Sequence, residues 1–346
     1  MNNLSSIKKD FRIVPLNEAD AKFESDHLHN LEKLVLANED MYPNIDQWLS
    51  GKVIPGLKTT ERAAWVGYMD EKPLVSAIVK RGKHSKFCHL RISDDFQDKN
   101  LGEIFFCLMA LEVRNMAEEI HFTLPKSLWD EKKKFFQSFR FHDAIKAGTQ
   151  YRIFDMELRC SSSFSDVWKA VLDKLSKIAE IFSAGGYSLG NNLVISFRPE
   201  YTKKILNGEK KVEIRRKFAT KWKGHRISLY SSSPIQSLVG EAIIDNVIIG
   251  EPDYIWEKFN SDICGTKEEF DKYVASKNEI YAIILDDVRP FKLEIPRSQV
   301  SHLLNQDLKP PQSYCSLKNN KPWAEAVSIA ALLQANFRNT IVHSQL

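Results

Sequence analysis

The sequence LRISDDFQDKNLGEIFFCLM, residues 90–109, joins a strand-like segment to a helix-like segment through a polar turn. The apolar residues after the turn recur at helical spacing, which predicts a helix that begins near Gly102. The first backbone N–H groups of a helix have no partners inside the helix and lie at the positive end of its dipole. The stretch therefore predicts a helix start that favours an anion such as a phosphate.

This order of strand, turn and glycine-containing helix start resembles the acyl-coenzyme A (acyl-CoA) site of the GNAT acyltransferases. The family pattern, Arg/Gln-x-x-Gly-x-Gly/Ala after a strand, is matched here by Gln97, Asn100 and Gly102. Asparagine can replace the first glycine because it visits left-handed backbone conformations more readily than most residues. The resemblance covers roughly residues 11–158 and implies a mixed sheet covered by helices.

The resemblance also implies how acetyl-CoA, or another acyl-CoA, is held. Backbone N–H groups of the turn and the first helical residues would cradle the pyrophosphate, and the preceding strand would hydrogen-bond the pantetheine arm. With one position on a later helix, the implied cofactor-binding residues are Leu90, Arg91, Ile92, Gln97, Asp98, Lys99, Asn100, Leu101, Gly102, Glu103 and Phe136.

Two departures from the family pattern concern catalysis. In the family an amine attacks the thioester, and a tyrosine on a late helix returns a proton to the departing thiolate. The tyrosine position is Phe136 here, which cannot donate a proton, and a glycine of the same motif is Arg140. The candidate catalytic residues are His89 and Cys88, which strand alternation would place on opposite faces of the sheet.

The composition is that of a globular protein with two domains. The chain has 346 residues, of which 43% are hydrophobic and 27% charged, and the length exceeds what one core usually organises. The first thirty residues lack the apolar centre of a signal peptide, which predicts a cytoplasmic protein without membrane contact. The five cysteines and nine histidines are scattered without metal-ligand spacing, so we expect reduced thiols and no metal.

The second half of the chain carries a concentrated positive charge. Residues 198–226 contain eleven Lys/Arg and three Glu, with aromatic residues within the stretch or adjacent to it. Cations and aromatic side chains on short strands supply phosphate contacts and stacking surfaces, which favours single-stranded nucleic acid or a nucleotide. A solvated basic face with a Glu213–Arg215 ion pair is the structural alternative.

This half resembles the ASCH domain, a small barrel related to the PUA fold. The family's Gly-x-Lys and Glu-x-Arg elements are matched by Gly208, Lys210, Glu213 and Arg215. ASCH domains are mostly thought to bind RNA, and one branch hydrolyses N4-acetylcytidine with a lysine, threonine and glutamate, of which only Lys210 is clearly matched here. The candidate nucleotide-binding residues are Phe197, Arg198, Lys210, Lys211, Glu213, Arg215, Arg216, Lys217, Trp222, Tyr230 and Ser231.

The sequence thus predicts an α+β protein with a GNAT-like mixed sheet followed by a PUA-like (ASCH) small barrel. The expected parts are a GNAT-like domain over 1–160, a linker helix and glycine hinge over 161–190, an ASCH domain over 191–318 and a C-terminal helix over 319–346. Three functions remain open: an N-acetyltransferase whose ASCH domain binds RNA, a nucleotide or a modified base; a catalytically degenerate CoA sensor or scaffold; and an N4-acetylcytidine-type amidohydrolase.

Overall fold

The computed structural model describes residues 9–16, 18–69, 71–97, 100–149, 151–152, 154–185, 187–188 and 191–336. The chain divides into two compact units, the first made of residues 1–189 and 331–346 and the second of residues 190–330. Among the described helices, none combines the length and apolar character that a membrane span requires. The predicted α+β class is confirmed.

The first unit is built on an eight-stranded sheet with the order β6-β7-β5-β4-β3-β2-β1-β8. Its strands are β1 Lys9–Leu16, β2 Arg62–Met69, β3 Lys72–Lys80, β4 His84–Ile92, β5 Glu119–Pro125, β6 Ala144–Lys146, β7 Glu157–Ser163 and β8 Tyr187–Ser188. Its helices are α1 Glu18–Phe23, α2 Asp26–Leu36, α3 Ile45–Trp48, α4 Ile54–Lys58, α5 Leu101–Val113, α6 Lys126–Ser138, α7 Phe164–Leu175 and α8 Ile178–Ala184. A π-helical turn, Leu49–Val53, joins α3 to α4, and a 3-10 turn, Asp94–Phe96, follows β4.

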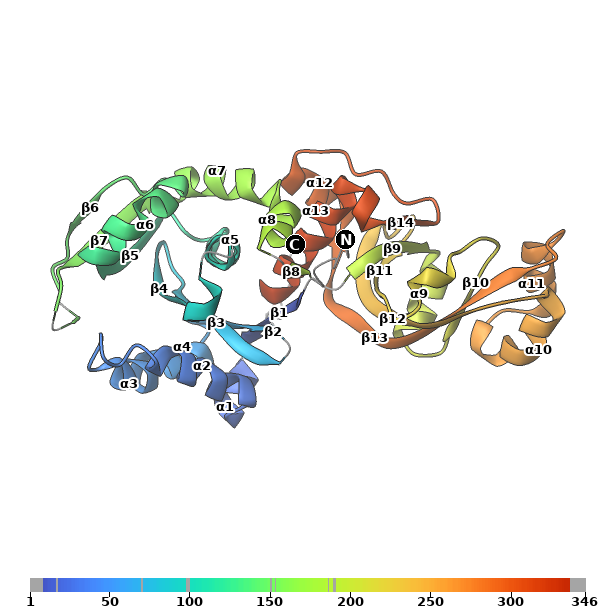
Figure 1. Cartoon of the computed structure of the whole chain (residues 1–346), viewed down its shortest axis with the longest axis horizontal. Helices are drawn as coiled ribbons and strands as arrows, with labels where there is room; N and C mark the ends of the chain where they lie inside the picture. Colours follow the sequence, from blue (N-terminus) through green and yellow to red (C-terminus); the bar gives the residue numbers. More distant parts are fainter. Residues whose placement is uncertain are drawn as a thin grey trace, which may run out of the picture. The chain divides into compact units, whose positions relative to one another are not determined.

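Strands β4 and β5 form a fork in this sheet. They pair in parallel only from His84 to Lys86 on β4 and from Glu119 to His121 on β5. Beyond this point β4 stays paired with β3 on its other side, while β5 stays paired with β7. The edges of β4 and β5 that face each other are therefore not paired with each other past Lys86 and His121 (Figure 1).

The two faces of the sheet have different cores. Helices α1–α4 cover one face of β1–β3 through a cluster that includes Leu31, Val35, Val66 and Ile78. Figure 1 shows these helices on one side of the strands and α5 on the other. On the α5 side Phe106 contacts aromatic rings from three elements, β4, β5 and α6, and from the loop after α6. The centroid distances are 4.2 to 6.4 Å, to Phe87, Phe122, Phe135, Phe139 and Phe141.

The expected linker over 161–190 differs from the structure. The serines of residues 161–163 end strand β7, and the Ser163 side chain caps α7 by accepting a hydrogen bond from the Asp166 N–H. Both α7 and α8 belong to the first unit. Serine clusters cap helices as readily as they form linkers, which explains the difference. Of the predicted hinge, Gly185 follows α8 in a right-handed conformation, and Gly186 lies outside the described residues.

The second unit contains a six-stranded sheet with the order β10-β13-β12-β11-β9-β14. The register of the two longest strands shifts at three points, and such irregularities let long strands bend as a half-barrel requires. The strands are β9 Asn191–Phe197, β10 Val212–Arg215, β11 Arg226–Ser231, β12 Ser237–Gly250, β13 Ile280–Pro296 and β14 Tyr314–Ser316. The helices are α9 Pro199–Leu206, α10 Pro252–Ile263, α11 Lys267–Val274, α12 Arg297–Leu304 and α13 Lys321–Asn336, with 3-10 turns at Thr220–Trp222 and Leu317–Asn319.

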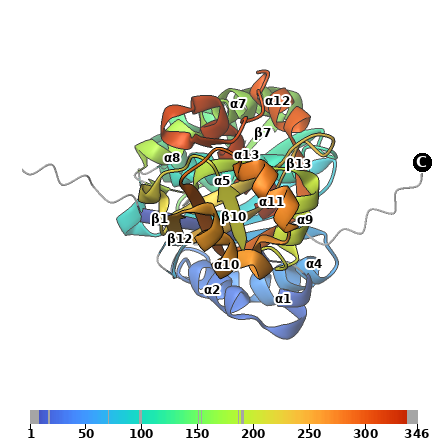
Figure 2. The same cartoon turned by 90° about the vertical axis from the view of Figure 1, so that its right-hand side faces the viewer.

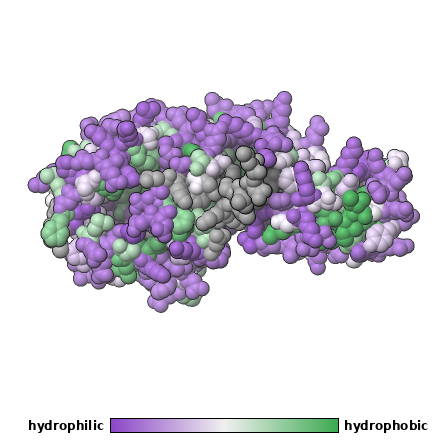
Figure 3. All heavy atoms as spheres, in the orientation of Figure 1, coloured by the Kyte–Doolittle hydropathy of each residue, from purple (hydrophilic) through white to green (hydrophobic). Residues whose placement is uncertain are grey.

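Two hydrophobic clusters support this second sheet. The larger joins β9, β11, β12 and β13 to α9, and the smaller joins α10 and α11 to β10 and β13. Figure 2 shows α10 and α11 in front of β10. The face visible in Figure 3 is mostly hydrophilic on the described parts of both units, with local apolar groups.

The structure describes part of the C-terminal helix that was expected over 319–346. It spans Lys321–Asn336, and residues 337–346 lie outside the described part of the chain. Its last residues belong to the first unit, where the Trp65 indole donates a hydrogen bond of 2.8 Å to the Ala335 carbonyl. The end of this helix therefore contributes to the core of the first unit.

Candidate cofactor and nucleotide sites

The first candidate site is the fork edge of β4. Residues Cys88 to Ile92 are all partly exposed, although β4 is a central strand of its sheet. A central strand is normally covered on both faces, so this exposure marks an open place in the sheet. The predicted pantetheine-binding residues Leu90, Arg91 and Ile92 lie here, and the Arg91 guanidinium donates to the Asn38 side-chain oxygen.

The start of α5 has the backbone conformation that the motif predicts. Asn100 is the N-cap residue in the left-handed region, with φ 61°, and helix α5 begins at Leu101. The Gln97 side chain is directed to Asp94, and Asp98 and Lys99 lie outside the described residues. A Cβ at Gly102 would meet the Phe135 ring at 3.5 Å and Ile92 at 3.6 Å, which is ordinary contact. The packing of the protein itself therefore does not require glycine at this position.

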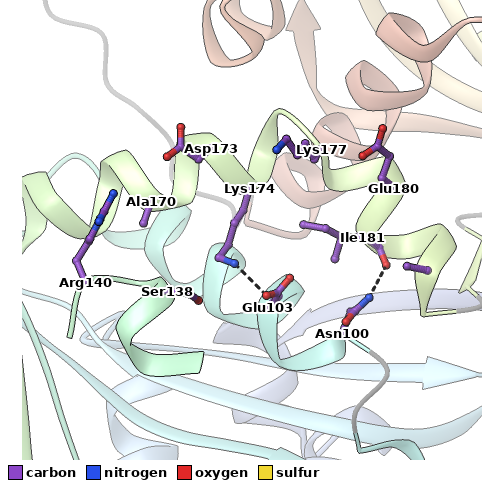
Figure 4. Close-up of a pocket in the computed structure, with 11 residues that line it drawn as sticks. Asn100, Glu103, Ser138, Arg140, Ala170, Asp173, Lys174, Lys177, Glu180 and Ile181 are labelled. Carbon is purple, nitrogen blue, oxygen red and sulfur yellow. Dashed lines mark hydrogen bonds and ion pairs between the residues drawn. The ribbon is translucent and has the colours of Figure 1, made fainter. Parts of the chain in front are cut away.

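A pocket of about 440 Å³ lies beside this helix start (Figure 4). Helix α8 forms one wall, where the Asn100 side-chain amide donates to the Ile181 carbonyl at 3.3 Å. Lys174 of α7 pairs with Glu103 of α5 at 2.9 Å. The ionisable residues that line the pocket are equally divided between cations and carboxylates: Arg140, Lys174, Lys177, Glu103, Asp173 and Glu180. An anion at the α5 start would therefore depend mainly on the backbone N–H groups.

The expected alternation of Cys88 and His89 is wrong. The register between β3 and β4 shifts at this point, so that Val79 pairs with Phe87 while Ile78 pairs with His89, which leaves Cys88 as a bulge. Cys88 packs against the cluster beneath α1–α4, and the Arg62 guanidinium donates to its Sγ at 3.1 Å. The His89 partner Ser76 stands opposite Val66 of that same cluster. A β-bulge lets both side chains face the same side.

His89 is held in its neutral form. Its Nε2 lies 2.8 Å from the Ser76 Oγ. Burial, assisted by the Arg91 charge, lowers the pKa of His89 to about 4. A base with this pKa is a weak proton acceptor at neutral pH, because it holds an abstracted proton poorly.

Of the two late-helix positions, Phe136 is partly buried among aromatic rings and Arg140 is exposed. Phe136 stacks on Trp129 with centroids 5.7 Å apart and lies 5.1 Å from Phe122. Arg140, which replaces a glycine of the family motif, adopts φ 70°. The backbone thus keeps the left-handed conformation that glycine favours, although the residue is arginine.

The second candidate site centres on three charged side chains of the second unit. Lys210 is 3% exposed, and its Nζ donates to the carbonyls of Val212 and Ile263 at 2.8 Å each and lies 3.4 Å from Glu213. The Glu213 carboxylate lies 2.9 Å from the Arg215 Nε. Burial lowers the pKa of Lys210, and Glu213 opposes this effect. All three ammonium donors of Lys210 therefore have acceptors within reach.

Arg215 extends this cluster toward the surface. Its guanidinium donates to the Ser196 carbonyl at 2.7 Å and to the Ser313 Oγ at 3.1 Å, and it lies over the Phe197 ring at 5.3 Å. The Glu213–Arg215 ion pair named as the structural alternative is present. The pair fixes a carboxylate and a guanidinium on one face of β10, as the alternation of VEIR predicts.

Three of the predicted nucleotide contacts are directed inward instead. Phe197 and Tyr230 are 3% and 0% exposed, so neither ring is available to stack on a base. The Ser231 Oγ is buried against the Thr202 Oγ1 at 3.0 Å. Trp222 is partly buried against the core, and Arg198, Lys211, Arg216 and Lys217 are exposed. Aromatic residues in short strands alternate between core and surface, and the sequence did not reveal which face these strands bury.

A basic cluster at the fork was not among the predicted site residues. His121 and Lys86 are register partners at the last paired position of β4 and β5, and Arg159 on β7 stands opposite Thr123. These residues are far apart in sequence and match no motif. Only the sheet register brings them together.

Comparisons with known proteins follow the same division of the chain. Residues 194–302 match a family described as a domain of unknown function, DUF365. A curated protein of Zymomonas mobilis, an ASCH domain-containing ribonuclease, is 27% identical over 128 residues, which cover 37% of this chain and 85% of that protein. The chain therefore contains a region that is similar in sequence to an ASCH domain-containing protein.

Solved structures with similarity to this chain fall into two groups. The structure of ASCH from Zymomonas mobilis is 26% identical, with a TM-score of 0.36, and covers 40% of this chain and 94% of its own. An acetyltransferase from Thermus thermophilus is 18% identical, with a TM-score of 0.28, over 44% of this chain and 97% of its own. A GNAT family acetyltransferase from Elizabethkingia anophelis with acetyl-CoA bound is 11% identical, with a TM-score of 0.32, over 44% and 98%.

Proposed function

We propose that the first unit is an acyl-CoA-dependent N-acyltransferase and that the second unit binds RNA, a nucleotide or a modified base. The observation that carries the first part is the fork, where β4 loses its pairing with β5 after Lys86 and runs on to the turn that leads into α5. An open strand edge can pair with the amides of an extended chain such as pantetheine. The α5 start, with Asn100 in the left-handed region, then offers backbone N–H groups to the pyrophosphate.

An acyl thioester supplies the acyl group, whose C–S bond breaks as the C–N bond to the amine forms. The amine must lose a proton and the thiolate must gain one. His121, at the apex of the fork, has a pKa lowered mainly by burial and next by Arg159, so it is the neutral histidine best placed to accept the amine proton. Phe136 cannot supply a proton to the thiolate, so water takes that role.

The test of this proposal measures thiol release. The full chain is incubated with acetyl-CoA and a mixed pool of amines, nucleosides and RNA, and free thiol is followed over time. We expect steady, amine-dependent release. Release that stops after one equivalent, or that is independent of amine, would argue against an acyltransferase.

The packing of Phe136 favours a second function, a CoA sensor without turnover. The ring lies between Trp129 and Phe122, and no proton donor stands at the usual position of the acid. The sensor predicts CoA binding without thiol release. Phe136→Tyr separates the two functions: in a transferase limited by thiolate protonation, the new hydroxyl should raise the rate about tenfold or more. In a sensor it should leave the rate at the background level.

The relative named a ribonuclease supports an RNA-directed role for the second unit. The exposed cations Arg198, Lys211, Arg216 and Lys217 supply phosphate contacts, and the fixed Glu213–Arg215 pair supplies a polar edge for a base. Cleavage of single-stranded RNA by this unit is one outcome to test.

Release of acetate from N4-acetylcytidine, lost in Lys210→Ala, is the other outcome to test in the second unit. Because Lys210 is buried with three acceptors, this variant needs a melting curve beside the assay. A folded Lys210→Ala variant with full deacetylation would exclude a catalytic role for Lys210. If the protein neither cleaves RNA nor deacetylates N4-acetylcytidine, the proposed role of the second unit is binding alone.

A further inference from the structure

The apex of the fork carries a basic cluster on one face of the sheet. His84 and Lys86 of β4 stand opposite Glu119 and His121 of β5, and register partners share a face. Arg159 joins the same face from β7, because its NH2 lies 3.2 Å from the Glu119 Oε1. The two histidine Nδ1 atoms lie 3.9 Å (His84) and 3.7 Å (His121) from that same oxygen.

The charges of this cluster are unbalanced. Three basic side chains, His84, His121 and Arg159, lie within 4.0 Å of the Glu119 carboxylate, and Lys86 stands opposite His121. Glu157, another carboxylate of β7, is buried and engaged by Arg152 at 3.0 Å. One carboxylate cannot neutralise the two permanent cations, Lys86 and Arg159.

Two further observations indicate that the cluster is built to meet a ligand. The His121 Nδ1 is buried and has no hydrogen-bond partner within the described part of the chain. Buried polar atoms without a partner are rare in folded proteins and call for an explanation. Arg159 is exposed, and the Lys86 Nζ lies over the Tyr151 ring at 5.1 Å. The cluster thus combines a buried nitrogen with accessible cations.

The place of the cluster connects it to the proposed chemistry. Lys86 and His121 are the last paired residues before β4 and β5 separate, so they border the opening in which the proposed thioester would lie. A substrate group held by these residues would place the rest of that substrate near the opening. A substrate whose amine and recognised group belong to one molecule would therefore have its amine near the proposed thioester.

We propose that the acyl acceptor is an amine that carries a phosphate group, and that Lys86, His121 and Arg159 bind this phosphate. This inference rests on the proposed acyltransferase function. The guanidinium of Arg159 matches the geometry of two phosphate oxygens, and Lys86 adds a point charge. Neutral His121 donates its one ring N–H to a third oxygen, and its other ring nitrogen stays an acceptor. Phosphate of a small amine and phosphate of an RNA chain share this chemistry, so the experiment tests both.

The binding experiment uses the full chain and does not depend on turnover. The histidine ring signals are followed by NMR during titration with inorganic phosphate, with phosphoethanolamine and ethanolamine, and with a short single-stranded RNA. His121→Gln assigns the ring signal. We expect saturable shifts at His121 with both small phosphates and none with ethanolamine. An RNA that shifts His121 more strongly than phosphoethanolamine identifies the polymer as the source of the phosphate.

Arg159→Glu and its matched control, Lys146→Glu, locate the site. Lys146 is an exposed residue of the neighbouring strand β6 that stands opposite Leu158, so it lies on the other face of the sheet. Loss of a charge-assisted contact should weaken phosphate binding by about tenfold to a hundredfold in Arg159→Glu and leave Lys146→Glu unchanged. Equal affinities in both variants, or no shift at His121 with any phosphate, would overturn the proposal.

Turnover separates this proposal from the proposed function. If CoA binds and thiol release is equally fast with ethanolamine and phosphoethanolamine, the acyltransferase stands and the phosphate site is wrong. If His121 responds to phosphate but no CoA binds, the phosphate site stands as a binding site, and its role in acyl transfer is wrong together with the proposed function.

Discussion

Single residues of this protein show how the fold constrains chemistry. The sequence placed His89 near the expected thioester, and in the structure its Nε2 lies 2.8 Å from the Ser76 Oγ. Its neutrality follows from burial, which no sequence pattern displays. Lys210 was named from a motif, and the structure gives it partners that the motif does not specify, the backbone carbonyls of Val212 and Ile263.

His89 makes the stability of the fold depend on pH. Its pKa falls from the ordinary 6.5 to about 4 in the folded chain, so between these values the unfolded chain binds a proton that the fold does not. Stability from this residue is therefore fully present above the unfolded pKa and is lost as pH falls toward the folded pKa, with a slope of at most about 1.4 kcal/mol per pH unit.

The measurement is urea unfolding at several pH values between about 4 and 6.5. His89→Gln should remove this part of the slope. A variant that loses stability with pH as steeply as the wild type would show that His89 is not neutral in the fold.

The left-handed backbone conformation of Arg140 predicts that a glycine at this position stabilises the fold. Its φ of 70° is strained for a side chain with a Cβ, and glycine relieves this strain. Arg140→Gly should raise the free energy of unfolding by about 1 kcal/mol. Arg140→Ala keeps the strain and serves as the control, and a destabilised glycine variant alongside an unchanged alanine variant would contradict the assignment.

At the scale of elements, the sequence predicted a strand, turn or helix well where its formation depends on its own residues. The strand, turn and helix of residues 90–109 form as the periodicity predicts, with Asn100 in the left-handed region. The bulge at Cys88 and the fork could not be predicted, because both depend on which strands pair and in what register. The serine cluster was misread because capping and linking sequences share the same composition.

The packing of α7 and α8 against α5 gives a prediction at this scale. The Lys174–Glu103 pair is largely shielded from solvent, and Lys174 also lies over the Phe139 ring at 4.7 Å. Lys174→Ala should cost about 1 to 3 kcal/mol of stability, because it leaves Glu103 without its cation. Hydrogen exchange should become faster in α7 and α8, whereas Lys169→Ala, on the exposed side of α7, should change little. Unchanged exchange in the first variant would show that this ion pair does not hold the helices.

At the scale of the whole molecule, the two units supply different kinds of contact. The first offers an open strand edge, a helix start and a basic cluster at the fork. The second offers exposed cations around a fixed Glu213–Arg215 pair. Joining two binding modules in one chain raises the local concentration of a substrate that both can hold. Under the proposed function, this arrangement would suit an RNA or nucleotide acceptor.

RNA binding should depend on salt through the exposed cations of the second unit. Each phosphate contact contributes about 0.7 to the slope of log affinity against log salt for a single strand. The double variant Arg216→Glu, Lys217→Glu should lower this slope by about one to two, and Lys277→Glu, which changes an exposed lysine outside the basic stretch, should not. A slope that is equal in both would place the RNA elsewhere.

The affinity of the full chain for CoA, determined by calorimetry in the wild type, Gly102→Ala and Gly102→Glu, shows whether the start of α5 binds the pyrophosphate. The alanine Cβ meets Phe135 and Ile92 at ordinary contact distances, so this variant should fold and retain binding. A carboxylate at the start of α5 should repel the pyrophosphate and weaken binding by at least about tenfold. No CoA binding in the wild type, or equal affinity in all three proteins, would contradict the account.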